Sequence, residues 1–212
     1  MMFGDGPLTF QEFAMRESLP LATIHDAVLE FLCDRDDAVL YGAQAVNAYV
    51  KQSRMTEDVD IACTRAKELA DELCRFLNKR FHIAVRVRRV KEGLGLRIYQ
   101  VRKPENRHLV DVRPVETLPP AKRVKKVLVV RPAELIAGKV AAYVRRRGKP
   151  KAGTDWRDLA MLFLTFPELK TPMGPVLDRL KAAGADEEVI TGWKELVAQD
   201  IQPEDEDEKF LR

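Results

Sequence analysis

Residues 54 to 63 read Arg-Met-Thr-Glu-Asp-Val-Asp-Ile-Ala-Cys, and this stretch decides the fold because it places two carboxylates on one strand. Successive side chains of a strand point to opposite faces, so Asp58 and Asp60 share one face while Val59 and Ile61 turn to the core. Paired carboxylates on a rigid strand suit Mg²⁺ or Mn²⁺, which bind carboxylate oxygens, water and substrate phosphates. The alternative is that both carboxylates form the solvated face of an edge strand.

The residues on either side of this stretch predict the rest of a transfer site. An apolar run at 38–41 ends at Gly42, and a helical stretch follows from Ala43. Glycine lets the backbone approach a ligand closely, and the amides that open a helix can receive a phosphate. Downstream, residues 108–113 alternate as another strand and supply a third carboxylate, Asp111. These parts are the minimal apparatus for metal-assisted phosphoryl or nucleotidyl transfer.

A later helix carries an isolated lysine. Residues 132–144 are apolar on nearly every side, with Lys139 in their middle. Its stem is expected to be buried, and a buried ammonium needs an anion, either an internal carboxylate or a substrate phosphate. A lysine that extends its ammonium to water from the edge of the core is the alternative. Further on, Thr154 or Asp155 is a natural helix N-cap, and capping alone could explain Asp155.

Together these motifs resemble the nucleotidyltransferase superfamily and, within it, the AbiEii-type nucleotidyltransferases, the toxins of bacterial type IV toxin-antitoxin pairs. The resemblance covers roughly residues 38 to 165. It rests on a small-residue turn before a helix, on the Arg-x-Thr-x-Asp-x-Asp pattern at 54–60, on a lysine in a helix after Pro132, and on Arg-Asp-Leu at 157–159. The chain departs from the family at Gly42-Ala43, where many relatives have Gly-Gly or Gly-Ser, so only backbone amides remain there for a phosphate.

The resemblance implies a Mg²⁺-dependent enzyme that moves a nucleoside monophosphate from an NTP to an acceptor, by analogy a tRNA end. The implied catalytic residues are Asp58, Asp60, Asp111, Lys139 and Asp158, the implied metal ligands are Asp58, Asp60 and Asp111, and the implied nucleotide-binding residues are Gly42, Ala43, Arg54, Thr56 and Lys139. Asp158, favoured over Asp155 by the family pattern, would orient Lys139 or help deprotonate the acceptor. A cognate antitoxin protein is a further implied partner.

Basic residues are concentrated in the middle of the chain. Residues 75 to 151 hold 23 Lys and Arg against 5 Asp and Glu, although the whole chain has a net charge of +3. Basic clusters at 86–91, 122–126 and 145–151 are typical of a surface that attracts a phosphate backbone, so RNA is the expected acceptor. The alternative is a solvated basic face, or one that docks an acidic partner protein. The clusters lack the aromatic spacing needed for base stacking.

Periodicity and length predict an α/β (α+β) fold, a nucleotidyltransferase-like mixed β-sheet flanked by helices, with a C-terminal helical region. Strands are predicted at 38–42, 58–63, 83–90, 95–101, 108–113 and 127–130, and helices at 21–33, 43–50, 65–79, 132–147, 155–165, 175–183 and 186–198. The predicted domains are an α/β core with N-terminal helices at 1–130, a helical region at 131–200 and an acidic flexible tail at 201–212. Residues 148–153, rich in Lys, Pro and Gly, predict a mobile loop.

Other function classes find little support in the sequence. No apolar stretch has the length of a membrane span and the start lacks the pattern of a signal peptide, so a cytoplasmic location is expected. The three cysteines favour reduced core thiols, and the three histidines, which share no ligand spacing, favour packing or surface roles. Two alternatives to the RNA-directed enzyme remain: a non-catalytic module that binds RNA or a protein, and transfer to a small molecule or a protein hydroxyl.

Overall fold

A computed structural model describes residues 19–90 and 93–203 of the chain. Its elements are α2 (Leu21–Leu32), β1 (Ala38–Tyr41), α3 (Gly42–Asn47), β2 (Val59–Cys63), α4 (Ala66–Phe81), β3 (Val85–Arg89), β4 (Leu96–Gln100), β5 (Arg107–Pro114), β6 (Ala121–Val124), β7 (Val127–Val130), α5 (Pro132–Arg145), α6 (Pro150–Thr165), a short 3₁₀ turn at Pro167–Leu169, α7 (Pro175–Ala182) and α8 (Glu187–Ala198). The acidic residues 204–212, Lys91 of the first basic cluster and the chain start lie outside the described residues.

One mixed sheet organises the molecule, in the strand order β3-β4-β5-β2-β1-β7-β6. Strand β2 runs parallel to β5 and antiparallel to β1, while β1 runs parallel to β7. The sheet therefore confirms the predicted α/β fold class. It also excludes the edge-strand alternative, because β2 has a partner on each side.

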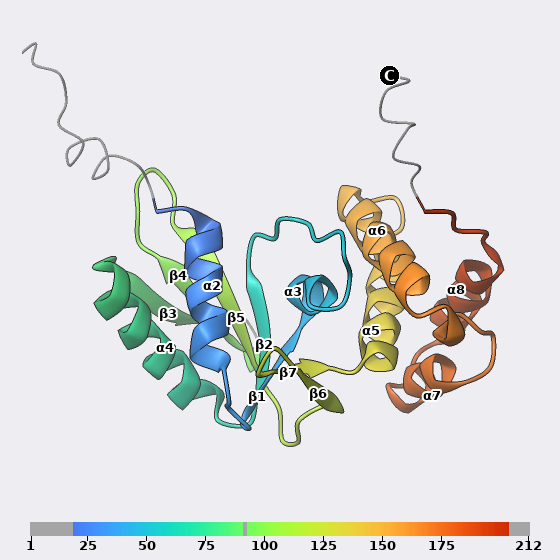
Figure 1. The fold of residues 1–212 in the computed structure, drawn as a ribbon, viewed down its shortest axis with the longest axis horizontal. Helices are drawn as coiled ribbons and strands as arrows, with labels where there is room; N and C mark the ends of the chain where they lie inside the picture. Colours follow the sequence, from blue (N-terminus) through green and yellow to red (C-terminus); the bar gives the residue numbers. More distant parts are fainter. Residues whose placement is uncertain (1–18, 91–92, 204–212) are drawn as a thin grey trace, which may run out of the picture.

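The helices lie in two groups around this sheet. Helices α2 and α4 lie against the β3–β5 side, whereas α5 to α8 gather beyond β7 at the other end (Figure 1). The core follows the alternation that the sequence predicts, since Val59 and Ile61 of β2 are fully buried while Asp60 between them is only half-buried. The division of the chain into domains near residue 130 stays a prediction.

The local predictions fail in two places, at the start of α6 and at β6. Helix α6 begins at Pro150, so residues 151–153 are helical and do not form the predicted loop, and Asp155 lies inside the helix instead of capping it. The reason is that the fixed φ of a proline suits the first helical turn. Strand β6 was not predicted, because it joins β7 through Lys125 and Lys126, which both have positive φ without the Gly or Asn that usually marks such a turn.

All three cysteines are free, and Cys63 is buried in the core. Within residues 19–90 and 93–203, no helix combines the length and the apolar character needed to cross a membrane.

Candidate active site

The three predicted carboxylates lie close together near the middle of the sheet, on and beside the neighbouring strands β2 and β5. Asp60 of β2 lies in register with Asp111 of the parallel neighbour β5, and Asp58 directly precedes β2. Between Asp58 and Asp111 lies His108, whose Nδ1 is 3.2 Å from Asp58 Oδ2 and whose Nε2 is 2.9 Å from Asp111 Oδ1. One ligand atom from each of these three residues lies within 4.8 Å of the others. The structure thus groups Asp58 and Asp111 with His108, which was not predicted, and the third predicted metal ligand, Asp60, lies outside this group.

His108 reaches this position through an irregularity in β5. Residues three apart on a regular strand point to opposite faces, yet His108 and Asp111 meet. The pairing of β4 with β5 shifts by one residue, because Ile98 pairs with Val110 while Tyr99 pairs with His108. The extra residue is Leu109, and Leu109 and Val110 are both fully buried. A bulge of this kind re-aims side chains beside active sites.

Gly42 makes room for the Asp60 carboxylate. Gly42 has a positive φ of 68°, and a Cβ atom added to it would lie 1.9 Å from Asp60 Oδ2. A larger residue would therefore meet both backbone strain and a direct clash. The sequence predicts that the backbone at Gly42 approaches a ligand closely. In the structure the group that lies close to Gly42 is the Asp60 carboxylate. Ala43 follows it in α3 and is half-buried.

The acidic residues have different electrostatic environments. Burial, then the nearby Asp58 and Asp111 carboxylates, raise the pKa of Asp60 from 3.8 to about 6. Burial acts in the same direction on Asp111, but hydrogen bonds from His108 and Arg97 outweigh it and hold the pKa of Asp111 below its ordinary value. Arg97 binds Asp111 with both ends of its guanidinium, at 2.9 and 2.8 Å.

The possible ligand atoms of Asp58, His108 and Asp111 fit a divalent cation. Carboxylate oxygens from Asp58 and Asp111, with the Asp60 carboxylate beside them, suit Mg²⁺, and an imidazole nitrogen is also acceptable to Mn²⁺. The raised pKa of Asp60 reports an excess of negative charge, which a bound cation would relieve.

A second set of predicted residues forms a chain of ion pairs whose carboxylates and lysine are buried. Arg54 donates to both oxygens of Asp158 at 2.7 and 2.8 Å, and Lys139 Nζ donates to Asp158 at 2.7 Å and to Asp155 at 3.3 Å. Arg146 then binds the other oxygen of Asp155 at 2.7 Å. Asp158 is only 1% exposed and Lys139 is 9% exposed. The sequence left two kinds of anion as partners of Lys139, a carboxylate of the protein or a phosphate of a substrate. In the structure the partners are carboxylates of the protein.

This ion-pair chain affects the protonation of Asp158. Burial on its own would raise the pKa of Asp158, but the Arg54 and Lys139 contacts together lower it. Because both oxygens already accept strong hydrogen bonds, Asp158 is well placed to hold Arg54 and Lys139 in position. It connects α6 with the loop before β2 and with α5.

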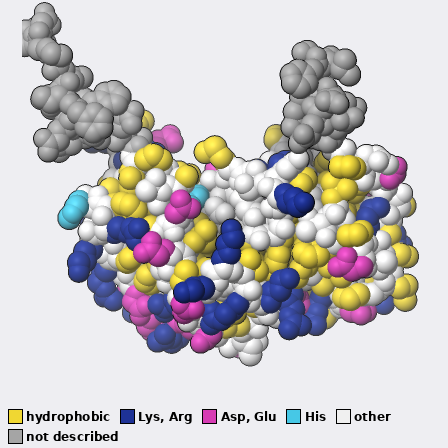
Figure 2. Space-filling model, in the orientation of Figure 1, with side chains coloured by type: hydrophobic (Ala, Val, Ile, Leu, Met, Phe, Trp, Pro, Cys, Tyr) yellow, Lys and Arg dark blue, Asp and Glu magenta, His cyan; other side chains and the backbone are white. Residues whose placement is uncertain are grey.

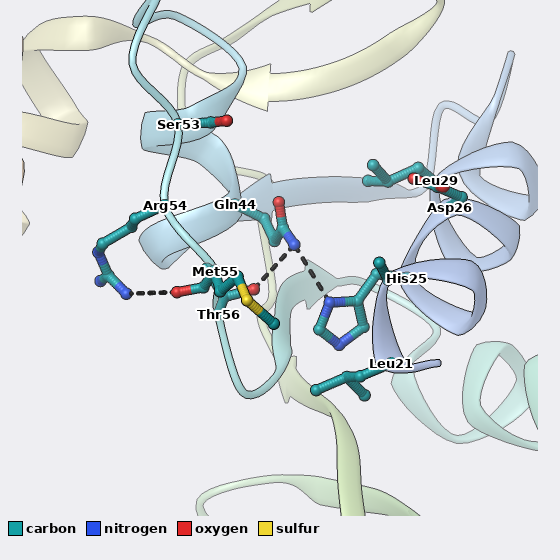
Figure 3. Close-up of a pocket in the computed structure, with 10 residues that line it drawn as sticks. Leu21, His25, Asp26, Leu29, Gln44, Ser53, Arg54, Met55 and Thr56 are labelled. Carbon is teal, nitrogen blue, oxygen red and sulfur yellow. Dashed lines mark hydrogen bonds between the residues drawn. The ribbon is translucent and has the colours of Figure 1, made fainter. Parts of the chain in front are cut away.

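Thr56 serves the loop before β2. Its hydroxyl accepts a hydrogen bond from Gln44 Nε2 at 2.8 Å, and the same amide group lies 3.3 Å from His25 Nδ1 (Figure 3). Asn47 fixes the same loop by bonding the backbone N–H and the carbonyl of Arg54. The Arg54–Thr56 segment is therefore clamped against α3.

The predicted basic clusters are partly neutralised within the protein. Arg123 pairs with Asp36, Arg146 with Asp155 and Arg147 with Glu195. Lys122 lies 4.8 Å from the centre of the Tyr49 ring. Figure 2 shows Lys and Arg scattered over the visible face, with Asp and Glu among them toward its lower left. The surface is accordingly less uniformly basic than the sequence clusters indicate.

Comparisons with known proteins agree with this architecture. Residues 30–208 match the family model described as the nucleotidyl transferase AbiEii toxin of type IV toxin-antitoxin systems. Among solved structures, the chain is similar to JHP933 from Helicobacter pylori, with 15% identity, a TM-score of 0.54, and coverage of 90% of this chain and 94% of that one. It is also similar to the Megavirus polyadenylate synthase, with 13% identity, a TM-score of 0.55, and coverage of 69% of this chain. The chain spans about a third of the length of that synthase (32%). No curated protein matches the sequence.

Proposed function

The chain belongs to the AbiEii family of nucleotidyltransferase toxins, and from this premise we propose that it transfers a nucleoside monophosphate from an NTP to an acceptor hydroxyl, with pyrophosphate leaving. The observation that carries the proposal is that Asp60 of β2 lies in register with Asp111 of the adjacent strand β5, with Asp58 directly before β2 and Gly42 opening space for Asp60. We propose RNA such as a tRNA end as the acceptor, an antitoxin as a further protein partner, and a cytoplasmic location.

Each acidic residue has a proposed role. Asp58, Asp60 and Asp111 would hold Mg²⁺ or Mn²⁺, and the bound cation would polarise the phosphate and make the acceptor hydroxyl more acidic. Arg97 and His108 keep Asp111 deprotonated, which suits it as a ligand better than as a proton acceptor.

The ion-pair chain has a proposed supporting role. Lys139 would neutralise charge on the triphosphate, and to do so its ammonium would turn from Asp155 and Asp158 toward the substrate. Asp158 would orient Lys139 and Arg54, since its carboxylate is fully engaged and almost inaccessible. Gly42, Ala43 and Thr56 would shape the turn and the loop beside the nucleotide.

The test is incubation of the purified protein with Mg²⁺, total RNA and each α-labelled NTP in turn. A double variant Asp58→Ala, Asp60→Ala is compared with a matched variant, Asp71→Ala, Asp178→Ala, whose two aspartates are exposed on α4 and α7. We expect label in a tRNA-sized band with the wild type and the matched variant only. Equal labelling by a folded double variant would refute the proposal.

One observation favours a second candidate, a non-catalytic module that binds RNA or a protein. Lys139 is already paired with two carboxylates, and Ala43 offers no hydroxyl to a phosphate. This candidate predicts no metal-dependent NTP binding, which equilibrium dialysis with and without Mg²⁺ would measure. Tight NTP binding only with Mg²⁺ would eliminate it.

A further inference from the structure

A small cavity opens near the carboxylates of Asp58, Asp60 and Asp111, between α2 and the loop before β2. Its volume is about 270 Å³, just below the roughly 300–1,000 Å³ of pockets that hold drug-sized ligands. Leu21 and Leu29 from α2 and Met55 from the loop supply apolar walls, and His25, Asp26 and Gln44 supply polar groups (Figure 3). Such a cavity suits a single flat ring system with polar edges.

His25, which lines this cavity, has a buried hydrogen-bond donor that is unused among the described residues. Burial lowers the pKa of His25, with the Asp58 carboxylate acting in the opposite direction, so the ring is neutral near pH 7. The Gln44 amide N–H₂ faces His25 Nδ1, which therefore accepts, and the ring proton belongs on Nε2. His25 is 5% exposed, and its Nε2 has no hydrogen-bond partner among the described residues. A buried donor without a partner destabilises the folded protein, which indicates a site that a ligand completes.

The position of the cavity connects it with the transfer site. Thr56, bonded to Gln44, lies two residues before Asp58 and lines the cavity, and Asp58 is close enough to act on the His25 ring. A molecule in this cavity would therefore lie next to the carboxylates. Met55 is 85% exposed at the cavity, and a solvent-exposed apolar side chain beside a polar site can pack on the face of a ring.

We infer that this cavity binds a nucleobase, with the His25 Nε2–H donating to a ring nitrogen or carbonyl oxygen of the base and the apolar side chains of Leu21, Leu29 and Met55 packing on its faces. The inference rests on the proposed function for its biological sense, but the binding itself does not depend on it. Every base carries an acceptor for such a donor. Asp26, at the exposed rim, accepts from an amino or imino group of the same base.

The first experiment measures binding without any phosphate or metal. The chain has three histidines, so the ring ¹⁵N signals of His25 are followed by NMR while adenosine, guanosine, cytidine or uridine is added. His82, exposed at the end of α4, is the internal control. We expect at least one nucleoside to move the His25 Nε2 signal and leave His82 unchanged, and ribose to move neither. An unmoved His25 signal with all four nucleosides at millimolar concentration overturns the inference, whether or not the protein transfers nucleotides.

The second experiment identifies the source of the base. Leu29→Trp fills the cavity, and Leu164→Trp, at an exposed leucine on α6 outside the cavity, is the matched control; melting curves establish that both variants fold. Loss of base packing is expected to raise a KM about five- to tenfold or more. A rise for the NTP assigns the cavity to the incoming nucleotide, and a rise for the RNA assigns it to the acceptor end. Unchanged KM values for both substrates in a folded Leu29→Trp protein overturn the inference.

Discussion

Removal of the charge on Asp60 is expected to stabilise the metal-free protein while it abolishes transfer. Asp60 is half-buried and is held next to Asp58 and Asp111, so its ionised form is unfavourable in the folded state. The variant Asp60→Asn keeps the shape of the side chain and cannot ionise. The gain in stability and the loss of activity would both result from the removal of the Asp60 carboxylate charge. This is expected for a site in which a bound cation balances that charge.

The size of the effect follows from the pKa. Moving from the ordinary value of 3.8 to about 6, at about 1.4 kcal/mol per pKa unit, corresponds to roughly 3 kcal/mol at full ionisation, as an upper estimate. Between these two values the folded protein binds more protons than the unfolded chain, so the stability of the wild type falls as pH rises from about 4 to about 6. Above pH 6 the whole penalty is present. The stability of Asp60→Asn should not show this fall between about pH 4 and about pH 6, because its side chain does not ionise.

The assay is urea unfolding in EDTA at pH 5 and pH 8, with Asp71→Asn on α4 as the matched control. We expect Asp60→Asn to be more stable than the wild type by about 1–3 kcal/mol at pH 8, and by less at pH 5. Mg²⁺ should narrow the difference by stabilising the wild type. Equal or lower stability of Asp60→Asn at pH 8 without metal would refute the reasoning.

Three other substitutions follow from the site geometry. Gly42→Ala forces a left-handed backbone that costs about 1–2 kcal/mol and displaces the Asp60 carboxylate, so melting temperature and transfer should both fall. Asp158→Ala leaves the buried Lys139 and the half-buried Arg54 short of a partner and should lower the free energy of unfolding by about 3–5 kcal/mol in urea titrations. Arg97→Ala frees the Asp111 carboxylate, so Mn²⁺ measured by calorimetry without NTP should bind about two- to fivefold more tightly.

Each of these predictions has a contrary outcome. An Asp158→Ala protein no less stable than Asp178→Ala, which removes an exposed aspartate, would mean that the ion-pair chain contributes little. Weaker Mn²⁺ binding by Arg97→Ala would show that Arg97 orients Asp111 for the cation. Full activity of Gly42→Ala would mean that transfer does not depend on the position of the Asp60 carboxylate beside Gly42.

Local patterns sufficed to predict the carboxylates, because strand alternation fixes which face a side chain takes. Asp58 and Asp60 needed only that rule, and Asp111 only a neighbouring strand in register. His108 could not be assigned from spacing, since the bulge at Leu109 reverses the alternation after it. The consecutive buried residues Leu109 and Val110 were the one local sign of the bulge.

The ion-pair chain was beyond the reach of any local pattern. Arg54 and Asp158 are 104 positions apart, and their contact depends on how α6 packs against the core. The sequence indicated that Lys139 must meet an anion, but burial alone does not choose between a carboxylate of the protein and a phosphate of a substrate. Similarly, the sequence allowed Asp155 to cap a helix, but α6 begins earlier, at Pro150. Asp155 therefore lies within the helix and is the second partner of Lys139.

The charges of the two halves of the site explain why one half is open to a cation and the other is not. On the acidic side, Arg97 pairs with Asp111, whereas Asp58 and Asp60 form no ion pair with a Lys or Arg among the described residues, and Asp58 contacts His108. One divalent cation would balance the charge of these two carboxylates. In the ion-pair chain, Arg54, Lys139 and Arg146 face Asp155 and Asp158, which leaves one positive charge. Because a buried pair is costly to break, a triphosphate should engage this side only after a cation has neutralised the acidic side. Metal binding is therefore expected to precede productive NTP binding.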